Sequence, residues 1–264
     1  MVHSLRWFSA LIFLSFFLCL PACRDYHTEE LPLVLNLEPE FSVDLFEQRD
    51  PADGTARFGL WVESMTDCGC SGCSVVAESA VQGSDVSVQL LGIQEPMPFA
   101  GAPAPARTFV PLGPLADGEY RFSLSLRSVV TNVGTLRVAQ GRYTLSMPDA
   151  QGVVFENYVL ETMPADMVWG YALTPDEPSV MAAQNWLADL KNITADGGLA
   201  PGFYSYFTVS GSGAMFFHKS FAPQGAAQVF VRKLAVPPGD LKGLLQTYRA
   251  NALEVRCLST LGEF

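Results

Sequence analysis

Short runs of alternating apolar and polar residues recur along residues 41–148 and constrain the fold more than any other feature. The clearest run is Tyr120–Leu126, in which large apolar residues stand at every second position. This spacing places apolar side chains on one face of a strand, whereas a helix needs a period of about 3.6. Turn residues such as Pro51-Ala-Asp-Gly54 separate the runs. The pattern therefore predicts about seven or eight short strands and no helix in this region.

Regularly spaced strands with turns between them are typical of immunoglobulin-like β-sandwiches. The stretch Asp117-Gly-Glu-Tyr120, which leads into the clearest strand, resembles the strand entries of many bacterial surface sandwiches. The Cys…Trp…Cys pairing of antibody domains is missing from the sequence. The resemblance is therefore one of architecture, and an architecture alone implies no function.

The pattern changes to mixed helices and strands after about residue 149. Expected strands cover residues 168–173, 203–209, 214–221, 228–234 and 253–258, and expected helices follow Thr174 and Pro237. For the first helix, Thr174 as N-cap, Pro175 and Glu177 predict a capping box. The order β-α-β-β-(β)-α-β is compatible with a ferredoxin-like layout, and a single larger α+β domain is the alternative.

The sequence thus predicts a mainly β chain with an α+β part. We expect a signal peptide (1–22), a lipid anchor with an acidic tether (23–40), an immunoglobulin-like β-sandwich (41–148), a linker (149–166) and an α+β domain (167–264). About 240 residues after the leader suit one large domain or two small ones.

The N-terminus carries Arg6 and then an apolar run, Trp7–Leu20, which is too short to cross a bilayer as a helix. Such a segment is typical of a secretory signal. The run closes with Leu20-Pro-Ala-Cys23, which resembles the lipobox of bacterial lipoproteins. That resemblance implies that Cys23 is acylated, for example with palmitate, and tethers the protein to a membrane. A conventionally secreted protein and an uncleaved anchor are the alternatives.

In the same lipoprotein class, aspartate after the acylated cysteine retains a protein at the inner membrane. Here Arg24 stands at that position, so the resemblance implies the outer membrane.

The chain has 27 acidic and 16 basic residues and a formal charge of −11. No basic patch is present in the sequence, so we expect no nucleic-acid partner.

After removal of the leader, which contains Cys19, four cysteines besides the anchor lie in what would be an oxidising compartment: Cys68, Cys70, Cys73 and Cys257. We expect two structural disulfides, one within the Cys68-Gly-Cys70-Ser-Gly-Cys73 loop and one from this loop to Cys257. Cys68–Cys70 is disfavoured because its ring would be very tight. The alternative is a zinc or copper(I) site formed by the same sulfurs, with Met65 or His218 as further ligands.

Aromatic residues are frequent in the second half, and Trp169, Tyr204 and Tyr206 are candidates for an exposed binding surface. Packing in the core is the alternative. Common catalytic motifs are missing, and the mature chain has only His27 and His218 as histidines. We therefore expect a non-enzymatic envelope lipoprotein that binds a protein, peptide or glycan, or has a structural role. A metal-binding envelope protein is the alternative, and a hydrolase with two carboxylates is a third hypothesis.

Overall fold

The computed structural model of this chain describes residues 37–69, 71–96 and 101–264. The expectations for the leader, for Cys23 and for most of the tether concern residues outside this part. Cys70 also lies outside it. Residues 37–264 belong to one compact unit.

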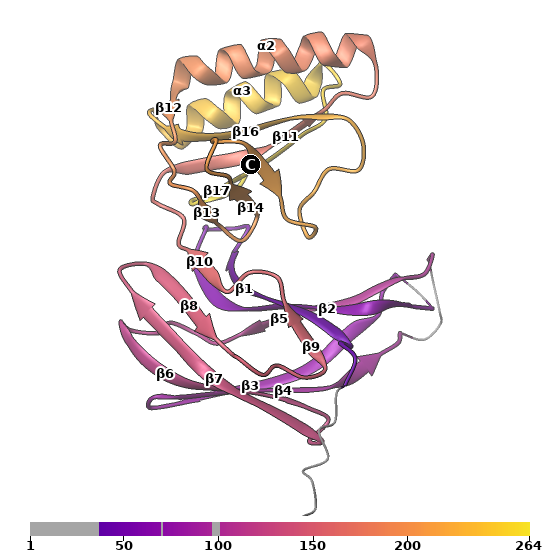
Figure 1. The fold of residues 1–264 in the computed structure, drawn as a ribbon. Coiled ribbons are helices and arrows are strands. Elements are labelled where there is room, and N and C mark those ends of the chain that lie inside the picture. The colour runs from indigo at the N-terminus through magenta and orange to yellow at the C-terminus, as the bar shows by residue number, and fades with distance from the viewer. Residues whose placement is uncertain (1–36, 70, 97–100) are drawn as a thin grey trace, which may run out of the picture. The chain divides into compact units, whose positions relative to one another are not determined.

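The chain is mainly β, as predicted. Its first ten strands are β1 (Phe41–Arg49), β2 (Ala56–Cys68), β3 (Ser74–Gln82), β4 (Asp85–Gln94), β5 (Ala104–Pro111), β6 (Gly118–Leu126), β7 (Val130–Ala139), β8 (Arg142–Ser146), β9 (Val153–Phe155) and β10 (Val159–Glu161). They form a four-stranded sheet, β5-β2-β1-β9, and a six-stranded sheet, β10-β8-β7-β6-β4-β3 (Figure 1). We call residues 41–161 the two-sheet region.

The two sheets of this region share one hydrophobic core. Val43 and Leu45 of β1 are buried in the same cluster as Phe122 and Leu124 of β6. The alternation read from the sequence is the cause, because every second side chain of each strand points to the same face. Strands β7 and β8 pair antiparallel and form a hairpin around Gln140-Gly141.

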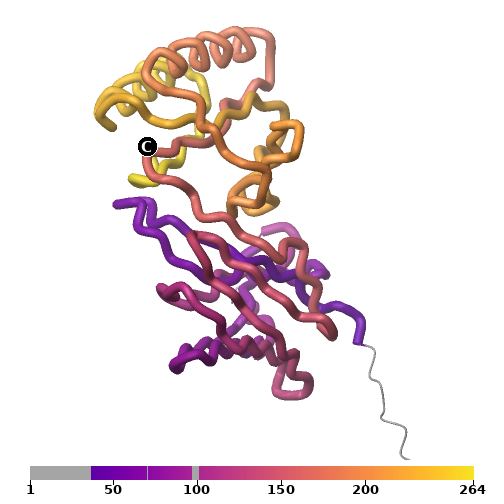
Figure 2. The backbone as a smooth tube through the Cα atoms, turned by 60° about the vertical axis from the view of Figure 1, so that its left-hand side comes forward, coloured from indigo at the N-terminus to yellow at the C-terminus, as the bar shows by residue number. Residues whose placement is uncertain are grey.

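Residues 149–166, expected as a linker, instead add a strand to each sheet of the two-sheet region. β9 pairs in parallel with β1, and β10 pairs antiparallel with β8. Both strands have only three residues, which is too short for a period-two pattern to stand out. Figure 2 shows the chain leaving the two-sheet region only after these strands.

The rest of the chain, residues 167–264, is the mixed region. Its elements are β11 (Met167–Leu173), α2 (Glu177–Ile193), β12 (Thr194–Asp196), β13 (Gly202–Phe203), β14 (Phe207–Val209), β15 (Met215–Phe217), β16 (Ala227–Leu234), α3 (Pro238–Ala250), β17 (Val255–Ser259) and β18 (Gly262–Glu263). An antiparallel sheet has the order β12-β16-β11-β17-β18, and β13-β14-β15 form a small second sheet.

Helix α2 was predicted in the right place, but its cap lies two residues later than expected. Asp176, not Thr174, is the N-cap, with extended backbone angles (φ −144, ψ 171). Its carboxylate accepts a hydrogen bond from the backbone N–H of Ser179 at 2.9 Å. The Ser179 hydroxyl in turn lies 3.1 Å from the backbone nitrogen of Asp176. Aspartate and serine thus form the capping box here.

Helices α2 and α3 lie on the same face of the five-stranded sheet (Figure 1). Trp186 of α2 is fully buried and packs edge-on against Phe230 of β16, with ring centroids 5.9 Å apart. Tyr248 of α3 donates a hydrogen bond to Asp189 of α2 at 2.7 Å. The opposite face of the sheet is covered by β13–β15, where Trp169 and Phe207 share another buried cluster.

Residues 203–209 do not form the single strand that the sequence predicted. The chain reverses between β13 and β14, and Ser205 adopts a left-handed backbone with φ 65.

Among the described residues, no helix combines the length and apolar character needed to cross a membrane.

Candidate functional site

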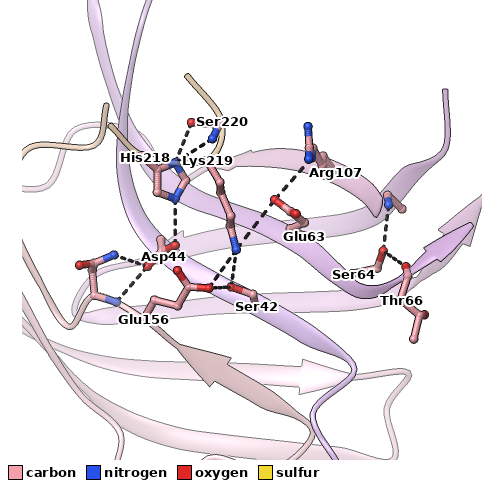
Figure 3. A network of polar contacts seen from close by, with 12 residues as sticks. Ser42, Asp44, Glu63, Ser64, Thr66, Arg107, Glu156, His218, Lys219 and Ser220 are labelled. Atoms are coloured by element: carbon pink, nitrogen blue, oxygen red, sulfur yellow. Dashed lines mark hydrogen bonds and ion pairs between the residues drawn. The ribbon is translucent and has the colours of Figure 1, made fainter. Parts of the chain in front are cut away.

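Strand β1 is buried on both faces, which is the origin of the main polar cluster. Its odd-numbered residues face the shared core, whereas Ser42 and Asp44 face the segment that follows β15. Ser42 is 3% exposed and Asp44 is 0% exposed. A buried carboxyl group is costly unless hydrogen-bond donors surround it. We call Ser42, Asp44, Glu156, His218 and Lys219 the polar joint (Figure 3).

The centre of the polar joint is a contact between Asp44 and His218. Nε2 of His218 lies 3.2 Å from Oδ2 of Asp44. The backbone N–H of Ser220 donates to Nδ1 of His218 at 3.3 Å, so Nδ1 is an acceptor. In the neutral ring the proton therefore sits on Nε2 and is donated to Asp44. The other Asp44 oxygen accepts from the backbone N–H and the side-chain amide of Asn157, both at 2.9 Å.

Lys219 forms the second half of the polar joint. Its ammonium group donates to Ser42 Oγ and to Glu156 Oε1, each at 3.0 Å. Oε2 of Glu63 lies 3.9 Å from the same ammonium group, and Arg107 Nε lies 3.4 Å from that oxygen. Negative and positive side chains therefore alternate across this contact, as Figure 3 shows.

The polar joint connects the two-sheet region to the mixed region. Asp44 and Glu156 belong to the first, and His218 and Lys219 belong to the second. Both oxygens of Asp44 and both ring nitrogens of His218 are occupied by partners within the chain. This arrangement supports a positioning role, because its buried polar groups satisfy one another.

A second set of contacts lies beside the polar joint. The Ser205 hydroxyl accepts from the backbone N–H of Glu47 at 2.7 Å, and the Tyr206 hydroxyl accepts from the backbone N–H of Arg49 at 2.8 Å. Burial raises the pKa of Tyr206 to about 12. Burial also raises the pKa of Glu47, although the neighbouring Arg49 lowers it.

The aromatic residues expected on an exposed surface lie in the interior. Trp169 is 0% exposed and Tyr204 is 5% exposed, and Tyr206 is partly buried against both cores. The reason is that β13–β15 fold over the face of the sheet that carries Trp169. The surface expected from these three residues is thus not formed, and the core alternative describes their environment.

The structure separates Cys257 from the cysteine loop. Cys68 and Cys73 contact the core of the two-sheet region, whereas Cys257 is buried in the core under α2 and α3. Cys257 is a free thiol, so the expected bridge from the loop to Cys257 is not formed. Its place on the inner face of β17 explains this, because its side chain points into the other core.

Metal binding by the cysteine loop stays a prediction. Among the residues that the structure describes, no group of three or more His, Cys, Asp or Glu could hold a metal ion. Cys70 is outside those residues, so the loop's own sulfur geometry is described only in part. His218, considered as a ligand from the sequence, is instead held by Asp44 and Ser220.

A groove beside β16 is the second candidate site. It has a volume of about 520 Å³ and lies between helix α2, the edge of β16 and the hairpin of β14 and β15. Its apolar walls include Leu187, Leu190, Leu199, Val209, Met215 and Val229. Lys191, Asp196 and Arg232 supply charged groups at its border. We call this feature the β16 groove.

Comparison with known proteins finds no relative of this chain. No protein-family model matches the chain, and neither a curated protein nor a solved structure matches it.

Replacing Asp44 by alanine tests the polar joint. The substitution leaves the donors of His218 and Asn157 buried without an acceptor. We expect the free energy of unfolding to fall by about 3–5 kcal/mol, measured by urea denaturation of the full chain. The control is Asp149→Ala, which removes an exposed carboxylate and should change stability by less than about 0.5 kcal/mol. Equal stability of the two variants would contradict the role given to Asp44.

The thiol of Cys257 gives a pH prediction. Burial raises its pKa to about 12, and the thiolate is the reactive form. We expect iodoacetamide at about pH 8 to leave Cys257 unmodified in the folded protein and to alkylate it after unfolding, as read by mass spectrometry. The unfolded chain loses this proton first, so stability should fall as pH rises from about 8.5 toward about 12. Cys257→Val should reduce this alkaline loss, and rapid alkylation of the folded protein would refute the assignment.

Proposed function

We propose that this chain is a lipoprotein of a bacterial envelope, anchored at the outer membrane through an acylated Cys23, with a non-enzymatic binding role toward a protein, peptide or glycan. The Leu20-Pro-Ala-Cys23 stretch supports the anchor. The observation that carries the binding role is the β16 groove, which is concave and lined by apolar side chains together with polar backbone and a few charged groups. Ligand sites generally combine these properties.

We propose an immunoglobulin-like sandwich for the two-sheet region. Two mostly antiparallel sheets around one core support it. We propose a ferredoxin-like fold for the mixed region. The strand order β12-β16-β11-β17, with α2 after β11 and α3 after β16, supports this fold, because it corresponds to a split β-α-β arrangement repeated once. The β13–β15 sheet is then an insertion between β12 and β16.

The anchor is tested by Cys23→Ser in the full chain expressed in a bacterium. Serine cannot accept the thioether-linked lipid, so the protein should move from the membrane fraction to the soluble extracytoplasmic fraction. Cys19→Ser, which changes a leader cysteine outside the Leu20–Cys23 stretch, is the matched control and should stay with the membrane. Membrane association unchanged by Cys23→Ser would show that the anchor is a different one.

One observation favours a second candidate, an envelope hydrolase. Ser220 Oγ lies 2.7 Å from Nδ1 of His218, whose Nε2 faces Asp44. The same three residue types form a Ser-His-Asp triad, in which serine contacts Nε2 and aspartate contacts Nδ1, so the two ring nitrogens are exchanged here. Ser220 also borders a cavity of about 300 Å³ lined by Arg49 and Trp61, among others. In this function Ser220 attacks an acyl carbon and His218 takes its proton, then gives it to the alcohol or amine that leaves as the ester or amide bond breaks; water afterwards releases the acyl group from Ser220. The binding role is preferred because His218 is 8% exposed and its Nδ1, which would take the serine proton, already accepts a hydrogen bond from the backbone N–H of Ser220.

A fluorophosphonate probe separates the two candidates, since it labels activated serines. A binding protein should remain unlabelled, and Ser220→Ala should leave partner binding unchanged. Stoichiometric labelling that Ser220→Ala abolishes, while Ser212→Ala in an exposed turn does not, would establish the hydrolase instead. The readout is the mass of the labelled peptide.

A further inference from the structure

Strand β16 is covered on one side along its whole length and on the other side only at its end. β11 pairs with Ala227–Lys233. β12 pairs only with Arg232–Leu234, because the chain turns away after Asp196. Within the described part of the chain, no strand pairs with residues 227–231 on the side of β12. Gly197 still lies next to Val231, so residues 227–230 leave roughly 10 Å of open strand edge at about 3.3 Å per residue.

Backbone hydrogen-bonding groups at this edge point into the β16 groove. The N–H of Leu234 donates to Asp166 on the β11 side, at 2.7 Å, whereas the N–H of Ala235 donates to Ile193 on the β12 side, at 3.1 Å. Backbone groups alternate between the two sides of a strand. Val229 is odd-numbered like Ala235, so its N–H and C=O face the β12 side, where it lines the groove.

The side chains around this edge define what fits against it. Val229 is 41% exposed although it is a large apolar residue. Lys191 and Arg232 lie at the end of the groove next to β12, where Asp196 is 3.5 Å from Arg232. The groove therefore combines apolar side chains with exposed polar backbone and has an excess of one positive charge at one end.

We propose that an extended peptide segment of a partner protein binds in the β16 groove by adding a strand to the open edge of β16. Its apolar side chains contact the groove walls, and an acidic residue lies at the end next to Lys191 and Arg232. This inference rests on the proposed binding function and names the class of partner. Strand addition of this kind supplies main-chain hydrogen bonds for affinity and side-chain pockets for specificity.

A peptide fits this edge better than a glycan or a second copy of the chain. Open strand edges present donors and acceptors at the spacing of another strand, which a sugar does not match. A second copy carries the same formal charge of −11, which opposes self-association. We expect an acidic residue on the partner because two basic side chains border the groove, although basic residues are few in this chain.

The test uses the full chain in detergent and a fluorescein-labelled hexapeptide of alternating threonine and valine that ends in glutamate. Binding is measured by fluorescence anisotropy. The same peptide ending in lysine, and the same peptide N-methylated at every backbone amide, should each bind at least about tenfold more weakly. In hydrogen exchange, the amide of Val229 should become protected when the glutamate peptide is added.

Val229→Pro removes the N–H that faces the groove without touching the pairing with β11, and proline is tolerated at such edge positions. It should abolish binding. The matched control is Val81→Pro in the edge strand β3, where the exposed fraction of Val81 is 40%. The Gln82–Asp85 pair closes the β3–β4 hairpin, so the N–H of Val81 faces away from β4. This control should bind normally.

Lys191→Glu provides a second variant that leaves the backbone unchanged. It should weaken binding of the glutamate peptide and strengthen binding of the lysine peptide. Equal binding to Val229→Pro and to the unchanged protein, equal binding of the N-methylated peptide, or no binding of any peptide would overturn the inference. None of these results affects the membrane fractionation of Cys23→Ser, so the lipid anchor is tested independently of peptide binding.

Discussion

The contact between Asp44 and His218 is the interaction on which the arrangement of residues 37–264 depends. A buried carboxyl group in the middle of β1 needs donors, and the segment after β15 supplies one of them. Such a pair adds little net stability compared with apolar packing, but it is costly to break. We infer that its main effect is specificity, because only one placement of the mixed region against β1 satisfies both groups.

Local patterns predicted the secondary structure well, since each depends on neighbours in sequence. The alternation in β6 and the apolar spacing of α2 are examples. The short strands β9 and β10 were missed because three residues carry no period. The N-cap of α2 was misplaced because Thr174 and Asp176 are both good caps, and only the backbone angles distinguish them.

The candidate site could not be predicted because its contacts join distant parts of the chain. Ser42 and Asp44 read as the solvent-facing positions of a half-buried strand, and nothing near them in sequence indicates that residues 218 and 219 cover them. For the aromatic residues the prediction was wrong in the opposite sense, because they were expected at the surface and lie in the interior. Tryptophan and tyrosine are common at binding surfaces, but β13–β15 fold over Trp169 and Tyr204. His218 was expected as a possible metal ligand, and the structure instead places it in the buried contact with Asp44.

The polar joint and the β16 groove are linked through the small β13–β15 sheet. Val209 and Met215 of this sheet line the groove, and His218 and Lys219 follow directly after its last strand. The wall opposite β16 is therefore held in place by hydrogen bonds to β1 and Glu156. A groove with one wall fixed by a buried polar contact is preorganised, which lowers the cost of ordering it when a partner binds.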